Sequence, residues 1–150
     1  MKTKILMVCL GNICRSPLAE GILKSKISSD NIFVDSAGTG HWHVGQLPDS
    51  RSIEVAKTHG IDLTDQRGRQ FTQKDFLEFD YIFVMDISNK SNVLQLAQNN
   101  SDKEKVQLIL DEIFPRENVD VPDPYYGGEQ GFESVFQMLD KACDEIVKRL

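Results

Sequence analysis

A short stretch near the N-terminus, VCLGNICRSP at residues 8–17, places a cysteine and an arginine on one loop. The apolar residues at positions 5–8 predict a short buried strand before it. Ser16 and Pro17 predict the start of a helix, with serine as the N-cap and proline at the first helical position. Between a strand and a helix N-terminus, backbone N–H groups can turn inward, so the sequence predicts an anion-binding loop.

Cys9 and Arg15 indicate what this loop does with an anion. The guanidinium of Arg15 is a planar fork that matches two phosphate oxygens. Positive potential favours the thiolate, which is the nucleophilic form of cysteine, so Cys9 is predicted to attack a bound phosphoryl group. The predicted phosphate-binding loop comprises Leu10, Gly11, Asn12, Ile13, Cys14, Arg15 and Ser16.

Other sites that these letters could form are less well supported. A nucleotide-binding P-loop needs a lysine at the position that Arg15 holds. A thioredoxin-type pair has two residues between its cysteines, whereas four separate Cys9 from Cys14, and a zinc site needs further ligands. A buried structural cysteine beside a surface arginine remains the plainest alternative.

Composition narrows the class of protein. The 150 residues suffice for one domain, residues 1–150, with a substantial core. A net charge of −6 argues against nucleic acid and membrane surfaces as partners. Three cysteines without a leader-like or long apolar segment predict a reduced, cytoplasmic protein.

Strands and helices are predicted to alternate along the chain. Apolar runs predict strands at residues 5–8, 32–35, 81–85 and 106–110; helical spacing and capping signals predict helices at residues 17–27, 49–60, 88–96 and 132–147. This order predicts an α/β fold, a parallel sheet with helices on both faces. Ligands of such sheets bind beyond the carboxyl ends of the strands, where we expect Cys9, Ser36 and Asp86.

A second chemical group follows near the C-terminus, in the segment VPDPYY at residues 121–126. Flanking prolines restrict the backbone around Asp123, so its carboxyl group can be presented to a leaving oxygen as a general acid. Tyr125 and Tyr126 can wall a slot for a flat ring. Taken alone, the segment favours an ordinary surface turn, because Asp-Pro is common in loops.

Four motifs together resemble the low-molecular-weight protein tyrosine phosphatases. They are VCLGNICRSP, DSAGT at residues 35–39, MDISN at residues 85–89 and DPYY at residues 123–126. The resemblance spans nearly the whole chain. It implies a four-stranded parallel sheet with the phosphate loop between the first strand and the first helix, no metal or other cofactor, and a phosphocysteine intermediate.

The resemblance also assigns roles residue by residue. It implies that Cys9 is the nucleophile, Arg15 the phosphate clamp, and Asp123 the acid that later activates water. Ser16 is implied to bond the thiolate, and Asn12 and Ser36 to support the loop, with Asn12 in a strained backbone conformation. The implied aromatic slot consists of Leu10, Trp42, Tyr125 and Tyr126, and Cys14 is the implied redox partner of Cys9.

Several residues fall outside these roles. Asp65 stands where many members of the family carry a histidine that supports the loop. Cys143 and His59 are predicted to be structural, and a solvated loop is favoured over a substrate contact for His41 and His43. Asp86 is expected either to tether the acid segment or to cap the next helix.

Phosphotyrosine hydrolysis is the function that these features favour. Protein substrates carrying phosphotyrosine, and phosphate-like oxyanions, are the predicted ligands of a monomer. The alternatives are a protein-arginine phosphatase, whose relatives place threonine where Ile13 stands, a thiol-dependent arsenate reductase, which needs further cysteines, and a phosphate-binding module without turnover.

Overall fold

The computed structural model describes residues 2–28, 30–126 and 129–150. The strands are β1 (Thr3–Cys9), β2 (Ile32–Gly38), β3 (Tyr81–Val84) and β4 (Val106–Leu108). The helices are α1 (Arg15–Lys26), α2 (Ser50–Thr58), α3 (Asp75–Glu78), α4 (Ile87–Leu94), α5 (Asn100–Glu104) and α6 (Glu129–Arg149), with 3₁₀ turns η1 (Ile109–Glu112) and η2 (Pro124–Tyr126).

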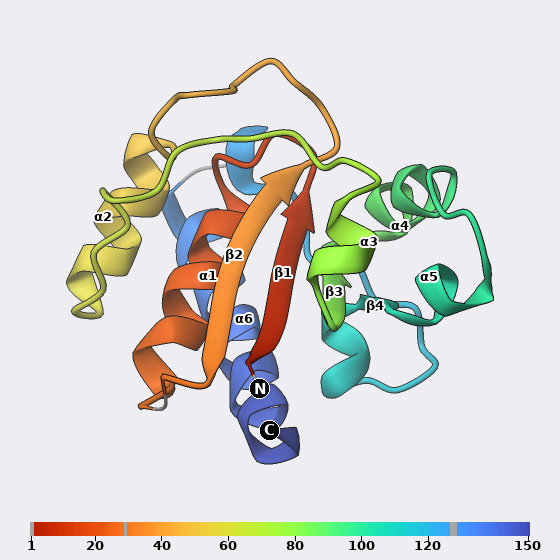
Figure 1. The fold of residues 1–150 in the computed structure, drawn as a ribbon. Helices are drawn as coiled ribbons and strands as arrows, with labels where there is room; N and C mark the ends of the chain where they lie inside the picture. Colours follow the sequence, from red (N-terminus) through yellow and green to blue (C-terminus); the bar gives the residue numbers. More distant parts are fainter. Residues whose placement is uncertain (1, 29, 127–128) are drawn as a thin grey trace.

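The four strands form one parallel sheet in the order β2-β1-β3-β4 (Figure 1). β1 lies inside the sheet, between β2 and β3, and its last residue, Cys9, is opposite Gly38 of β2. The predicted four-stranded parallel sheet is therefore confirmed. Its register brings the end of β1 and the end of β2 to one edge, where a ligand can reach both.

Helices cover both faces of the sheet, as predicted. On one face, Ile5 and Met7 of β1 pack with α1, α2 and α6, which supply most of the larger core. On the other face, Leu6 and Val8 pack with α3 and α4, where Phe76 and Val93 are buried. Successive β1 side chains thus enter opposite cores, because a strand alternates its faces and both are covered.

The start of α1 differs from the sequence-based expectation. The helix begins at Arg15, after Cys14, and no side-chain bond caps it. Ser16 is therefore not an N-cap, and its hydroxyl faces Cys9 instead. Because the helix begins at Arg15, Pro17 lies in the first turn, where its missing N–H is tolerated. The helix N-terminus is consequently part of the phosphate loop.

Other boundaries also shift. β2 extends to Gly38, so Ser36 lies within the strand, paired with Met7, and not beyond its end. β3 ends at Val84, and β4 ends at Leu108 where the chain turns into η1. Asp49 caps α2 by accepting from the N–H of Arg51, as its position predicted, but the short helices α3 and α5 were not predicted.

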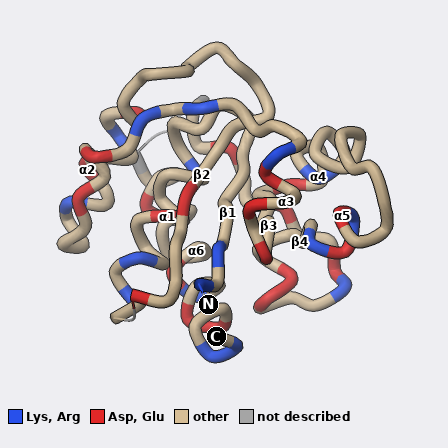
Figure 2. Tube along the Cα trace, viewed as in Figure 1, with Lys and Arg blue, Asp and Glu red and all other residues tan. Residues whose placement is uncertain are grey.

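Charge is spread over the whole chain. Figure 2 shows Lys and Arg interspersed with Asp and Glu on most elements. The helices in residues 2–28, 30–126 and 129–150 include none with the length and apolar character of a membrane-spanning segment.

Candidate active site

Cys9 is the last residue of β1; it is 2% exposed and belongs to the lining of a cavity. The backbone N–H of Asn12 points at Cys9 Sγ over 3.3 Å, and Ser16 Oγ lies 3.0 Å from the same sulfur. The Asn12 N–H and the Ser16 hydroxyl can both donate a hydrogen bond to this sulfur.

Asn12 determines which way the Ser16 hydroxyl points. Its Nδ2 group donates to Ser16 Oγ at 2.8 Å and to Ser36 Oγ at 3.0 Å. Because Ser16 Oγ already accepts a hydrogen bond from Asn12, its own proton is free to be donated to Cys9 Sγ. The side chain of Asn12 therefore orients a hydroxyl toward the thiol.

The backbone of Asn12 has a φ of 57°, in the left-handed region. Such a conformation is uncommon outside glycine and is more readily adopted by asparagine. The Asn12 carbonyl oxygen Oδ1 accepts the N–H of Arg69 at 3.0 Å, so all three side-chain bonds hold this backbone in place. The expected strain at Asn12 is present, and its support comes from Ser16, Ser36 and Arg69, whereas Asp65 is exposed.

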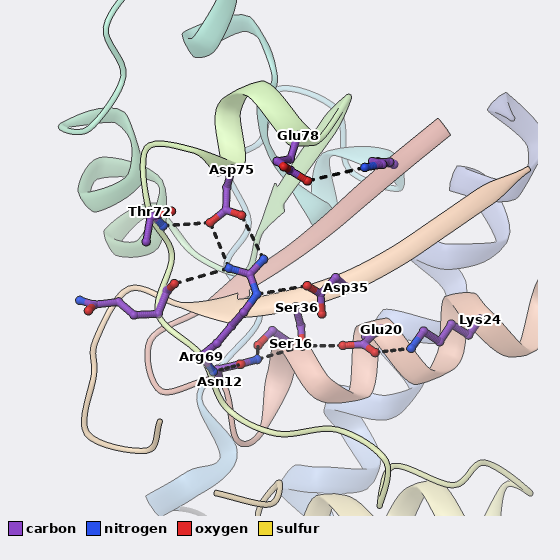
Figure 3. A network of polar contacts seen from close by, with 12 residues as sticks. Asn12, Ser16, Glu20, Lys24, Asp35, Ser36, Arg69, Thr72, Asp75 and Glu78 are labelled. Atoms are coloured by element: carbon purple, nitrogen blue, oxygen red, sulfur yellow. Dashed lines mark hydrogen bonds and ion pairs between the residues drawn. The ribbon is translucent and has the colours of Figure 1, made fainter. Parts of the chain in front are cut away.

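Behind Asn12 the network continues to the surface through two residues that the sequence did not single out (Figure 3). Ser36 Oγ donates to the buried carboxylate of Glu20 at 2.6 Å, and the other Glu20 oxygen pairs with Lys24 Nζ at 2.5 Å. Burial raises the pKa of Glu20, while Lys24 and Ser36 oppose that shift. Lys24, one helical turn away, therefore keeps a charged acceptor in place for Ser36.

Arg69 joins the same network from the other side. Its guanidinium binds both oxygens of the buried Asp75 at 3.0 and 3.1 Å, and its Nε donates to Asp35 at 3.1 Å. Figure 3 shows this side chain clamped between α3 and β2. These bonds hold Arg69 in place, and with it the backbone N–H that donates to Asn12 Oδ1.

Arg15 lies on the first turn of α1 with its side chain only 3% exposed. Nη1 donates to Asp86 Oδ2 at 2.7 Å and to the Val121 carbonyl at 2.8 Å. Burial disfavours the charge of the guanidinium, but Cys9 and Asp86 outweigh that effect and raise the pKa of Arg15. Asp86 also caps α4 by accepting from Asn89 N–H. The same carboxylate therefore holds the Arg15 guanidinium and caps the N-terminus of a helix.

Asp123 belongs to residues 120–125, which we call the acid loop. Its Oδ2 lies 3.8 Å from Arg15 Nη2, and its Oδ1 accepts the N–H of Tyr125 at 3.0 Å. The loop is bound to the segment that leads from β3 into α4: Val121 N–H donates to the Met85 carbonyl at 2.8 Å, and Asp120 accepts from Ile87 N–H at 2.9 Å. These hydrogen bonds therefore hold Asp123 in a position close to Arg15 of the phosphate loop.

One cavity of about 300 Å³ joins these groups. It is lined by Cys9, Leu10, Gly11, Ile13, Cys14, Arg15, Trp42, His43, Asp123 and Tyr125. Of the predicted slot residues, Leu10, Trp42 and Tyr125 are in this lining; the side chain of Tyr126 lies outside the described part of the structure. His43, for which a solvated loop was favoured, belongs to the lining as well, because the loop after β2 folds back over Gly11.

Trp42 lies over a glycine at the mouth of this cavity. A Cβ placed on Gly40 would be 1.9 Å from the Trp42 ring, so only glycine permits this ring position. The ring of His41 stacks on the same indole at 5.6 Å, and Trp42 remains 61% exposed. The ring is thus positioned by local packing while one side stays available.

The three cysteines occupy different environments. Burial, together with the charges of Asp49 and Cys9, raises the pKa of Cys14 to about 12, so this residue is a neutral thiol at pH 7. Cys143 is fully buried in α6, away from the cavity lining, as predicted for a core residue. No cluster of three His, Cys, Asp or Glu side chains suited to a metal ion occurs among residues 2–28, 30–126 and 129–150.

Comparison with known proteins relates this arrangement to one family. A family model described as low molecular weight phosphotyrosine protein phosphatase matches residues 4–150. The low molecular weight phosphotyrosine protein phosphatase of Schizosaccharomyces pombe is 42% identical over 143 residues, which covers 91% of this chain and 90% of that protein.

Solved structures agree over the whole chain. A protein tyrosine phosphatase from Entamoeba histolytica, solved with Hepes in the active site, superposes with a TM-score of 0.92 at 39% identity and covers 99% of this chain and 96% of that one. A Drosophila arginine phosphatase superposes with a TM-score of 0.88 at 37% identity, covering 99% and 97% of the two chains.

Proposed function

The chain belongs to the low molecular weight phosphotyrosine protein phosphatase family, and we propose that it hydrolyses phosphotyrosine in proteins through a phosphocysteine on Cys9. The observation that carries this mechanism is the meeting of Cys9, Arg15 and Asp123 in one cavity. A binding module without turnover would need neither the thiol nor the acid.

In the first step, the Cys9 thiolate attacks phosphorus while the bond from phosphorus to the phenolic oxygen breaks. Arg15 and the N–H groups of the phosphate loop hold the phosphoryl oxygens, whose charge spreads over the equatorial positions. Asp123, across the cavity from Cys9, donates its proton to the leaving oxygen. The products of this step are a free phenol and phosphocysteine.

In the second step, the Asp123 carboxylate takes a proton from water, and the water oxygen attacks phosphorus. The bond from sulfur to phosphorus breaks, and Cys9 leaves as a thiolate. The Ser16 hydroxyl, already aimed at Cys9 Sγ over 3.0 Å, stabilises that leaving group. Inorganic phosphate is released, and Asp123 is again protonated for the next cycle.

We further propose that Cys14 protects the nucleophile after oxidation. Peroxide converts the Cys9 thiolate to a sulfenic acid, and the Cys14 sulfur then forms a disulfide with Cys9 as hydroxide leaves. Because the pKa of Cys14 is raised to about 12, its thiolate is scarce at neutral pH. Trapping by Cys14 should therefore accelerate about tenfold per pH unit between pH 7 and 9, which mass spectrometry of quenched samples can follow.

The ring of phosphotyrosine fits the apolar part of the cavity lining. Ile13, Leu10 and Trp42 are apolar side chains beside the phosphate loop, and they suit an aryl ester better than a charged guanidinium. The similarity to a Drosophila arginine phosphatase makes phosphoarginine the rival substrate to test.

Phosphate release from matched phosphotyrosine and phosphoarginine peptides, measured in EDTA, tests this function. We expect faster release from phosphotyrosine and complete loss in Cys9→Ser, which should still bind inorganic phosphate because the loop is intact. Preference for phosphoarginine would overturn the assigned substrate. Full activity in Cys9→Ser would overturn the mechanism.

A further inference from the structure

Arg51, on the first turn of α2, lies over two aromatic rings although it is outside the cavity lining. Its guanidinium carbon is 5.4 Å from the centre of the Tyr125 ring and 4.6 Å from that of Phe132. Phe132 is 1% exposed in α6, so it provides a fixed surface for the guanidinium. Tyr125, the other ring, lines the cavity.

Asp49 fixes the orientation of the Arg51 guanidinium. Its two carboxylate oxygens accept from Nε and Nη2 of Arg51, each at 3.1 Å. The backbone N–H of Asp49 donates to the Ile13 carbonyl at 2.7 Å. Arg51 is therefore connected through Asp49 to the phosphate loop itself.

Through Tyr125, Arg51 is also connected to Asp123. Tyr125, which stacks on the guanidinium, donates its N–H to Asp123 Oδ1 at 3.0 Å. A continuous set of contacts thus runs from Ile13 through Asp49, Arg51 and Tyr125 to Asp123. It joins the loop that binds phosphate to the loop that supplies the proton.

We propose that Arg51 is a positioning residue that sets the preference for aryl phosphates, a proposal that rests on the proposed phosphatase function. It fixes the Tyr125 ring as a wall of the slot at the distance that the phosphate loop dictates. A flat leaving group then meets a wall already in place, so less freedom is lost on binding. Phosphate itself is held by Arg15 and the loop amides and does not depend on this contact.

Lysine cannot replace arginine here. Its ammonium is a point charge without the planar fork that binds both Asp49 oxygens and stacks on two rings. A cation over an aromatic ring contributes an amount that corresponds to about a threefold to thirtyfold change in affinity. Arg51→Lys should therefore raise KM for a phosphotyrosine peptide by about that factor.

The experiment compares an aryl and an alkyl phosphate ester in wild type, Arg51→Lys and Arg51→Met. We expect KM for the phosphotyrosine peptide to rise in both variants, while the inhibition constant of inorganic phosphate and kcat/KM for the alkyl ester stay within about twofold. Equal losses for both esters, or a weaker phosphate inhibition constant, would overturn the proposal, since they would indicate general damage to the site.

Arg149 provides a matched control at the opposite end of the sheet. It also stacks on a tyrosine, with its guanidinium carbon 5.3 Å from the Tyr81 ring, and it pairs with Glu112 at 2.7 Å. Arg149→Lys should leave the preference for the aryl ester unchanged. If the wild type does not hydrolyse phosphotyrosine, the proposed function is rejected. If the wild type is active and the Arg51 variants have an unchanged KM for the phosphotyrosine peptide, only this inference is rejected.

A double-mutant cycle separates the stacking contact from other effects of Arg51. In Tyr125→Leu the ring is absent, so Arg51→Lys should change KM by less than about twofold in that background. Tyr125→Phe retains the ring and should retain the dependence on Arg51. Additive effects of Arg51→Lys and Tyr125→Leu would contradict the proposed coupling.

Discussion

The network behind the phosphate loop and the mouth of the cavity are built differently. The floor, by which we mean Asn12, Ser36 and Glu20 behind the phosphate loop, is at most 4% exposed and its members are joined by hydrogen bonds. The rim, by which we mean Leu10, Trp42 and Tyr125, is between 40% and 61% exposed. Buried polar groups are costly when a partner is removed, whereas exposed side chains are not. Changes in the floor should therefore alter turnover and stability together, and changes in the rim should alter substrate binding alone.

Removal of the acid sharpens this comparison, because Asp123 belongs to neither region. Asp123→Asn preserves shape and the acceptor for Tyr125 N–H but cannot protonate the leaving oxygen. We expect kcat for phosphotyrosine to fall by about 10²- to 10⁴-fold, with little change in the unfolding midpoint. Burst kinetics with an ester of a more acidic phenol should show a smaller loss, because that leaving group needs less help. An equal fall in the burst rate for both esters would contradict the role of Asp123 as the acid.

Asn12 tests the floor directly. Asn12→Ala removes three side-chain hydrogen bonds. It also places alanine, which adopts the left-handed region less readily than asparagine, at a φ of 57°. We expect kcat to fall by about 10- to 100-fold, because the loop N–H groups and the Ser16 hydroxyl are no longer held in the orientation that the reaction needs. The free energy of unfolding should fall by about 2 to 4 kcal/mol. Both quantities come from steady-state kinetics and urea unfolding of the same preparation.

Two controls separate backbone strain from lost hydrogen bonds. Asn12→Gly relieves the strain and should recover part of the stability but not the activity. Asn118, which is exposed and has a φ of 54°, is the matched position outside the site. Asn118→Ala should lower stability modestly and leave kcat unchanged. Recovery of full activity by Asn12→Gly would mean that the side-chain bonds do not position the loop.

Lys24 tests whether the floor depends on a charge at the surface. Burial places the pKa of Glu20 above its ordinary value of 4.5, and Lys24 opposes that shift. A raised carboxyl pKa means that the folded state binds the proton more tightly, so stability declines as pH rises from about 4.5 through the folded pKa. Lys24→Met raises that pKa further. It should lower the free energy of unfolding by about 1 to 3 kcal/mol at pH 7 and converge with wild type near pH 4.

Urea unfolding of wild type and Lys24→Met at pH 4 and pH 7 measures this difference. Lys141→Met, an exposed lysine on α6, is the control and should show no such dependence on pH. A loss of the same size at both pH values would contradict the electrostatic explanation.

Residues close together in the sequence were the ones that could be predicted. Cys9 and Arg15 share one loop, so their local order indicated a nucleophile in a phosphate-binding loop. The role of Asp123 came from the family resemblance, because its segment taken alone is an ordinary surface turn. Glu20 and Arg69 could not be found in this way. On its helix, Glu20 resembles a surface acid paired with Lys24, and only the approach of Ser36 from β2 makes it part of the floor.

The misplaced helix start has a similar cause. Ser16 has the ideal sequence position for an N-cap, but its hydroxyl is engaged by Cys9 and Asn12. A tertiary contact therefore overrides a local preference at the functional site. The strand order β2-β1-β3-β4 was likewise beyond the hydrophobic pattern, which specifies alternation of elements but not which strands are neighbours.

Trp42 tests the rim and should give the smallest effect. Its indole is 61% exposed and lies over Gly40, so removing it leaves no buried cavity. Trp42→Ala should raise KM for phosphotyrosine peptides by about 3- to 10-fold, the amount expected for one aromatic contact. The inhibition constant of phosphate and the unfolding midpoint should stay close to wild type. Leu77→Ala, 85% exposed on α3, is the matched control without effect on KM. A fall in kcat of tenfold or more in Trp42→Ala would erase the distinction between rim and floor, since turnover would then depend on both.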